Sequence, residues 1–279
     1  MATVSPARIF GRPAPAQVWL GPRQGRALSF TSEALASHDT ALLLGPRACG
    51  KSTILDTMLQ DLPDAMFFRL RDRWESGVSL RSALMESVGL SPAGASESGD
   101  RELLGAHLLA QRQAGRTVVF AIDDAERLPK DAWRELFRLR AVSLGSDAYF
   151  LFVGRAETHD ALRSAGAGGW PSLKVVVHTM ASPTEDEISA YVLHRLHMAG
   201  ISPALFPSRA RAQVARRSKG SFARVNLLCQ VAILLAQRRS LPRIDATLVE
   251  QASRMLSRGS LHRKPATLQN TARGQSAVT

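Results

Sequence analysis

The residues best suited to chemistry form one stretch of eight that fits the pattern G-x-x-x-x-G-K-[ST]: Gly45-Pro46-Arg47-Ala48-Cys49-Gly50-Lys51-Ser52. Glycine is needed in such a loop because a Cβ atom would keep backbone N–H groups away from a phosphate. Lys51 would place a positive charge on the β- and γ-phosphates, and the Ser52 hydroxyl would ligate Mg²⁺. With Thr53 after it, the stretch predicts a site for ATP and Mg²⁺. A chance match is the alternative, but the apolar strand before it and the helix after it favour the site.

A pair of acids forms the second candidate element, directly after the apolar run Thr117–Ile122. Ligands bind at the carboxyl ends of strands in open α/β sheets, so we expect Asp123 and Asp124 near the phosphate loop. Asp123 is expected to hold Mg²⁺, and Asp124 to orient or deprotonate the attacking water. The alternative for Asp124 is a structural role, as the N-cap of a helical turn over Ala125–Leu128.

The chain before residue 180 alternates apolar strands with helices. Strands are expected over Thr40–Leu44, Ala65–Leu70, Thr117–Ile122, Tyr149–Val153 and Leu173–Val177. Helices are expected over Lys51–Leu62, Val78–Val88, Arg101–Ala114 and Asp131–Leu139, with a loop over Ser91–Asp100. Because every strand is apolar throughout, this order predicts an α/β fold, with a parallel sheet covered on both faces.

After Met180 the pattern is helical alone. Helices are expected over Thr184–Ala199, Ser208–Arg217, Ser221–Arg238 and Ala246–Leu256. Thr184 and Glu187 have the spacing of a capping box at the start of the first of them. We therefore divide the chain into a basic N-terminal segment (1–30), an α/β core (31–180), a helical lid (181–257) and a disordered basic tail (258–279).

Composition bounds the environment and the partners. Only Cys49 and Cys229 are present, which favours a reducing cytoplasm, and no apolar run is long enough for a membrane span. The net charge is +12, and residues 1–30, 208–243 and 258–279 hold four, nine and four Lys or Arg without any acid. This segregation suggests an anionic partner such as nucleic acid or a membrane surface. Ordinary solvated arginines are the alternative.

Further stretches carry a resemblance to a known family: Phe10-Gly11, Val18-Trp19-Leu20-Gly21-Pro22, Phe152-Val153-Gly154-Arg155, Glu187, Tyr191-Val192-Leu193-His194-Arg195-Leu196, Gly220, Arg224, Asn226 and Leu228-Cys229. With the two motifs above, they resemble AAA+ ATPases of the general secretion pathway A (ExeA-like) type, relatives of the transposition (TniB-like) ATPases. The resemblance implies an AAA+ core with a lid, a homo-oligomer, and a sensor role for Arg224. The chain departs from the family at Asp124, where glutamate is usual, and at Arg155, where glutamine is usual. An arginine finger is not evident around Gly168–Lys174.

These features predict a cytoplasmic ATPase that couples ATP binding and hydrolysis to assembly or remodelling of a partner complex, of the secretion or envelope type. One alternative is an ATP-dependent DNA-binding regulator of transposition, which the basic segments favour. Another is a switch that binds ATP and hydrolyses it slowly, because Asp124 is shorter than the usual glutamate.

Overall fold

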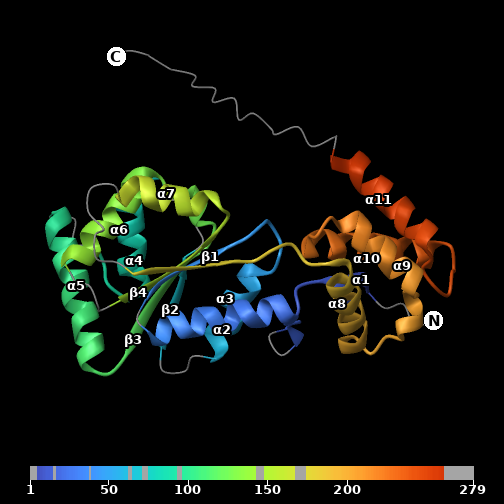
Figure 1. Ribbon diagram of the computed structural model, residues 1–279, viewed down its shortest axis with the longest axis horizontal. Helices are drawn as coiled ribbons and strands as arrows, with labels where there is room; N and C mark the ends of the chain where they lie inside the picture. The colour runs from blue at the N-terminus through green and yellow to red at the C-terminus, as the bar shows by residue number, and fades with distance from the viewer. Residues whose placement is uncertain are drawn as a thin grey trace, which may run out of the picture.

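The computed structural model describes residues 5–14, 17–37, 39–61, 65–70, 75–92, 96–142, 148–166 and 174–260. Figure 1 shows two parts of the chain side by side, an α/β part and a bundle of helices. The segment after β5 (Val175–Thr179) leads from the first part to the second. The last helix continues to Ser260, into the range from residue 258 that was expected to be a basic tail. Residues 261–279 of that expected tail lie outside the described part.

Five parallel strands form a single sheet in the order β2-β3-β4-β1-β5, which confirms the expected parallel α/β fold. The strands are β1 (Thr40–Leu44), β2 (Ala65–Leu70), β3 (Thr117–Ile122), β4 (Ala148–Gly154) and β5 (Val175–Thr179). The fifth strand extends two residues beyond its expected end, since Leu44 pairs with Thr179. This strand lies at the edge of the sheet and is half exposed, so its last residues can be polar. The apolar run in the sequence therefore ended before the strand does.

Helices cover both faces of the sheet. One face packs against α2 (Pro22–Ala36) and α3 (Lys51–Asp61), and the other against α4 (Gly77–Ser87), α5 (Glu97–Gln113), α6 (Lys130–Val142) and α7 (Glu157–Gly166). The expected loop over Ser91–Asp100 is wrong at its end, because Ser96 caps α5 by accepting the Gly99 N–H at 3.0 Å. Helices α2 and α7 were not expected from the sequence.

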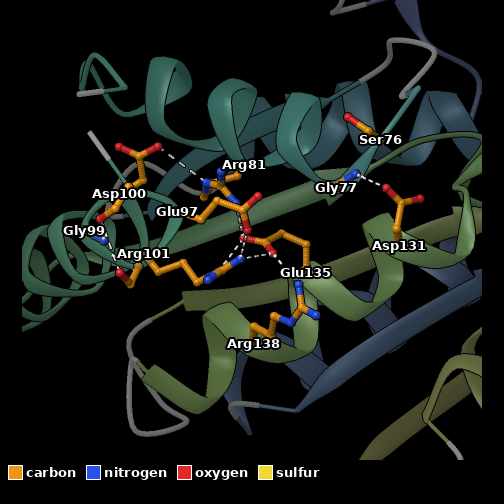
Figure 2. Close-up of polar contacts among 12 residues, drawn as sticks. Ser76, Gly77, Arg81, Glu97, Gly99, Asp100, Arg101, Asp131, Glu135 and Arg138 are labelled. Atoms are coloured by element: carbon orange, nitrogen blue, oxygen red, sulfur yellow. Dashed lines mark hydrogen bonds and ion pairs between the residues drawn. The ribbon is translucent and has the colours of Figure 1, made fainter. Parts of the chain in front are cut away.

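A buried ionic cluster ties α4, α5 and α6 together (Figure 2). Glu135 on α6 is 2% exposed and accepts hydrogen bonds at 2.8 Å from Arg81 on α4 and from Arg101 on α5. Arg81 also lies 3.6 Å from Asp100. The carboxylate thus supplies the counter-charge that lets Arg81 be buried and Arg101 be largely covered between three helices.

The lid contains α8 (Glu185–Met198), α9 (Ser208–Ser218), α10 (Phe222–Arg238) and α11 (Ala246–Ser260), as expected apart from end residues. The capping box is present: Thr184 Oγ1 accepts the Glu187 N–H, and Glu187 accepts the Thr184 N–H. The short helix α1 (Pro6–Phe10) packs into the same bundle through Ile9 and Phe10. The N-terminal segment is therefore shared, with α1 on the lid and α2 on the sheet. Among the described helices, none is both long and apolar enough to cross a bilayer.

Candidate active site

The phosphate loop connects β1 to α3 and is wrapped tightly. Gly50 has φ of 106°, a conformation that side chains rarely adopt, and a Cβ on Gly45 would lie 2.8 Å from the Met180 carbonyl oxygen. The Lys51 ammonium donates hydrogen bonds at 2.7 Å to the Gly45 and Pro46 carbonyls. The loop thus has the close backbone path and the positioned lysine that a phosphate site requires.

Asp123 follows β3 and meets the start of α3. The Ser52 hydroxyl donates to Asp123 Oδ2 at 3.0 Å, and the Asp123 carboxylate is buried. These hard oxygen donors fit Mg²⁺, which commonly takes one or two protein oxygens and completes its shell with phosphates and water. Among the described residues, no group of three His, Cys, Asp or Glu side chains could by itself hold a metal ion.

Arg69 near the end of β2 was not expected at this site. Its Nη2 atom lies 2.6 Å from the same Asp123 Oδ2, and its Nη1 atom contacts Asp56 on α3. The Arg69 side chain is only 10% exposed, and the carboxylates of these two acids compensate its positive charge. A single arginine in the otherwise apolar strand β2, whose residue Leu70 pairs with Ile122, is the sequence signal that could have identified it.

Asp124 occupies a left-handed conformation, with φ 54° and ψ 38°, at the start of the 3-10 turn η2 (Ala125–Arg127). Its side chain makes no capping hydrogen bond, and it lies 3.5 Å from Arg127. The alternative of an N-cap therefore lacks the contact that defines a cap.

Glu126 and Arg155 form a fixed pair beside Asp124. The Glu126 carboxylate accepts from Arg155 Nε at 2.8 Å and from the Arg155 backbone N–H at 3.2 Å. Burial by itself would raise the pKa of Glu126, but these hydrogen bonds outweigh it and hold the pKa below the ordinary carboxyl value. Gly154, directly before Arg155, leaves room for this pair, because a Cβ there would lie 2.1 Å from Thr158 Oγ1 and 2.8 Å from Glu126 Oε2.

A cavity of about 500 Å³ extends from this acidic end to the lid. Its far wall carries Trp19 from the N-terminal segment, Tyr191 from α8 and Phe222 from α10, with ring centroids 4.8 to 5.7 Å apart. The Phe222 N–H donates to the Ala48 carbonyl of the phosphate loop at 3.0 Å. The cavity therefore has a charged end and an aromatic end, joined by a direct contact between lid and loop.

Most of the expected binding residues line this cavity: Arg47, Ala48, Gly50, Lys51, Ser52, Thr53, Asp123 and Asp124. Cys49 is buried beneath the loop, and Gly45 and Pro46 contribute the carbonyls that hold Lys51. Arg224 is placed differently, because its Nε donates to the Arg217 carbonyl at 2.8 Å and it is not among the lining residues. The lining residues that sequence reasoning did not assign include Gln24, Glu126, Arg127 and Asn226.

Residues 36–162 match the protein family described as AAA domain. Over 234 residues, 81% of this chain, the sequence is 25% identical to General secretion pathway protein A of Aeromonas hydrophila, and it spans 42% of the length of that relative.

Two solved structures illustrate the likeness in fold. The Aeropyrum pernix ORC1 protein in complex with DNA has a TM-score of 0.66 and 17% identity, over 91% of this chain and 70% of that one. The Thermotoga maritima RuvB Holliday junction branch migration motor has a TM-score of 0.59 and 16% identity, over 88% of this chain and 73% of that one. With the phosphate loop and the five-stranded parallel sheet, these findings show that residues 36–162 are similar to an AAA domain and that the chain has the P-loop AAA+ fold of these structures.

Proposed function

We propose that this chain binds ATP with Mg²⁺ in the cavity and hydrolyses the ATP to drive assembly or remodelling of a partner complex, of the secretion or envelope type. The observation that carries the proposal is that one cavity has a phosphate loop and acids at one end and three aromatic rings at the other. These ends suit the triphosphate and the base of a nucleotide. The proposed setting is a homo-oligomer in the cytoplasm.

Each residue has a proposed task in the reaction. Lys51 neutralises the β- and γ-phosphates, and Ser52 and Asp123 would hold Mg²⁺, which supplies charge neutralisation at the phosphates. Asp124 accepts a hydrogen bond from the attacking water and sets its direction. Arg155, held by Glu126, lines the cavity on the same side and adds positive charge there.

Contacts between lid and core supply a route by which the partner could sense the nucleotide. Arg23 on α2 forms an ion pair at 2.8 Å with Glu187 on α8, and Phe222 at the start of α10 touches the loop through Ala48. We propose that Arg224 is the residue of the lid that senses the nucleotide. In that role its guanidinium would exchange the Arg217 carbonyl for the γ-phosphate.

Replacing Lys51 with Ala tests the site. The variant should lose tight ATP binding, because the phosphates lose their main counter-charge within the loop. Equilibrium titration with a fluorescent ATP analogue measures the affinity, and a melting curve of each protein checks that the fold is kept. Equal affinity in a folded Lys51→Ala protein would refute the assignment of the loop.

A second candidate function is ATP-dependent binding of duplex DNA in transposition. It is favoured by exposed basic side chains on the lid, at Arg209, Arg216, Arg238, Arg239 and Arg243. Arg211 and Arg217 are less available than the sequence suggested. Arg211 donates to Ser189 Oγ and to the Phe206 carbonyl, and Arg217 pairs with Glu250 at 2.6 Å.

A further inference from the structure

A chain of hydrogen bonds runs through the lid and ends at the aromatic end of the cavity. Arg195 Nη2 donates to the Gly11 carbonyl at 2.8 Å, and Arg195 Nη1 donates to the Tyr191 hydroxyl at 3.1 Å. The Tyr191 hydroxyl in turn lies 2.7 Å from Asn226 Oδ1. Tyr191 and Asn226 both line the cavity, whereas Arg195 is only 5% exposed.

The direction of this chain is fixed by its first member. A guanidinium has donors and no acceptor, so Arg195 must donate to the Tyr191 oxygen. The Tyr191 hydroxyl, whose oxygen accepts from Arg195, donates its own proton to Asn226 Oδ1. The distance of 2.7 Å is that of an O–H···O bond, shorter than the usual N–H···O bond of about 2.9 Å. Burial also raises the pKa of Tyr191, so the proton stays on the hydroxyl.

An asparagine amide is otherwise ambiguous, because its oxygen and nitrogen ends have the same shape. Here the oxygen is committed to Tyr191, and the free end of Asn226 is the NH₂ group, which can only donate. The cavity wall near the rings of Trp19 and Phe222 therefore offers a donor of fixed polarity. A ligand group that is itself a hydrogen-bond donor would be repelled, because both hydrogens carry partial positive charge. A ligand group that is a hydrogen-bond acceptor would be bound.

We propose that Asn226 is a base-reading residue, whose amide NH₂ donates to an acceptor ring nitrogen of the purine, with its polarity set by Arg195 through Tyr191. The inference rests on the proposed function, because it requires that a nucleotide occupies this cavity. It identifies the ligand class at the aromatic end as a purine with an unprotonated ring nitrogen toward α10.

Deaza analogues test the donor directly, since each replaces one ring nitrogen by C–H and leaves the triphosphate intact. Binding of ATP, 1-deaza-ATP, 3-deaza-ATP and 7-deaza-ATP is measured by calorimetry on the full chain and on Asn226→Ala. We expect one analogue to bind the parent about three- to tenfold more weakly than ATP, which is the usual worth of one hydrogen bond. In Asn226→Ala that analogue and ATP should bind equally.

The polarity is tested by Asn226→Asp, which keeps the shape and replaces the donor by an acceptor. This variant should bind ATP at least as weakly as Asn226→Ala, while Tyr191→Phe should reduce the discrimination between ATP and the sensitive analogue. Gln230→Ala is the matched control on the same helix. The Gln230 amide donates to the Phe10 carbonyl at 2.8 Å, away from the cavity lining, so its discrimination should match that of the parent.

The outcomes separate the two proposals. If the folded parent binds neither ATP nor tripolyphosphate, the proposed function is wrong. If the parent binds ATP but all three deaza analogues bind as well as ATP, Asn226 does not read a ring nitrogen. Parent-like ATP affinity in Asn226→Asp would overturn the assigned donor polarity.

Discussion

Asp124 has a backbone conformation that few residues other than glycine adopt, and its carboxylate is 55% exposed beside the cavity. Aspartate tolerates this conformation better than most residues, and outside glycine it often marks a functional position. Its side chain forms no cap, so the cost of this conformation is not offset by a structural hydrogen bond of the capping type. This agrees with the proposal that Asp124 acts on a ligand.

Changing the length and charge of this side chain should change the rate of hydrolysis. Aspartate is one methylene shorter than glutamate, and a misplacement of about 1 Å can slow a reaction roughly 10²-fold. We expect slow hydrolysis in the parent, faster hydrolysis in Asp124→Glu and slower hydrolysis in Asp124→Asn. Single-turnover assays of the three proteins give these rates.

ATP affinity is the internal control for this series, because Ser52 and Asp123 are the residues assigned to the metal. It should stay nearly constant in all three proteins. If Asp124→Asn hydrolyses ATP as fast as the parent does, Asp124 has no part in directing the water.

The helices α4, α5 and α6 depend on one carboxylate. Glu135 is the shared partner of Arg81, which is 3% exposed, and of Arg101 (Figure 2). Removing one member of a buried ion pair leaves the other charge without compensation, at a cost of about 3–5 kcal/mol. We therefore expect Glu135→Ala to lower the free energy of unfolding by about that amount, measured by urea denaturation.

Arg138→Ala is the matched control for this prediction. Arg138 lies 3.6 Å from the same carboxylate but is 59% exposed, so its loss should cost no more than about 1 kcal/mol. If both variants lowered the free energy of unfolding equally, burial of the ion pair would not decide how much it contributes to stability.

The same carboxylate gives the stability a pH dependence of known sign. Burial alone would raise the pKa of Glu135, but hydrogen bonds from Arg101 and Arg81 outweigh it and lower the pKa. A lowered pKa in the folded state stabilises the protein above the ordinary carboxyl pKa, and that contribution is lost as the pH falls through the lowered value. The gap in stability between the parent and Glu135→Ala should therefore narrow on acidification.

At the scale of the whole molecule, the positive charge gathers on the lid. Exposed arginines lie at the start of α9 and after the end of α10, and the Ile244 N–H donates to the Leu205 carbonyl at 2.8 Å, which brings the segment of Arg243 beside the start of α9. If this surface neutralises about five DNA phosphates, the log–log salt dependence of binding should have a slope of roughly −4 to −5. Filter binding at several salt concentrations, with ATP present, measures it.

One double variant and one single variant sharpen that test. Arg238→Ala with Arg239→Ala should reduce the magnitude of the slope by about 2, since both side chains are exposed. Arg217→Ala should change it less, because Glu250 already pairs with Arg217 at 2.6 Å. Absence of duplex binding at low salt, together with an ATPase rate that DNA does not alter, would exclude the DNA-binding candidate.

The sequence by itself determined the parts of this protein that depend on neighbouring residues. Buried strands such as β3, the phosphate loop and the capping box at Thr184 are local patterns of apolar residues, glycine and hydroxyl groups, and the structure has them where they were expected. The helix α2 was not expected, and its buried face includes two polar residues: Gln24 Nε2 donates to the Cys49 carbonyl, and Thr31 Oγ1 donates to the Ala27 carbonyl.

Only the tertiary structure decided how the cavity is completed. Trp19, Tyr191 and Phe222 come from three separate segments, and nothing in their local sequence indicates that their rings meet. Arg69 reaches Asp123 only because β2 pairs with β3, and Asn226 acquires a fixed polarity only because Arg195 lies behind Tyr191. These contacts join residues far apart in the chain, and their geometry is set by packing, which a pattern of residue types along the sequence does not encode.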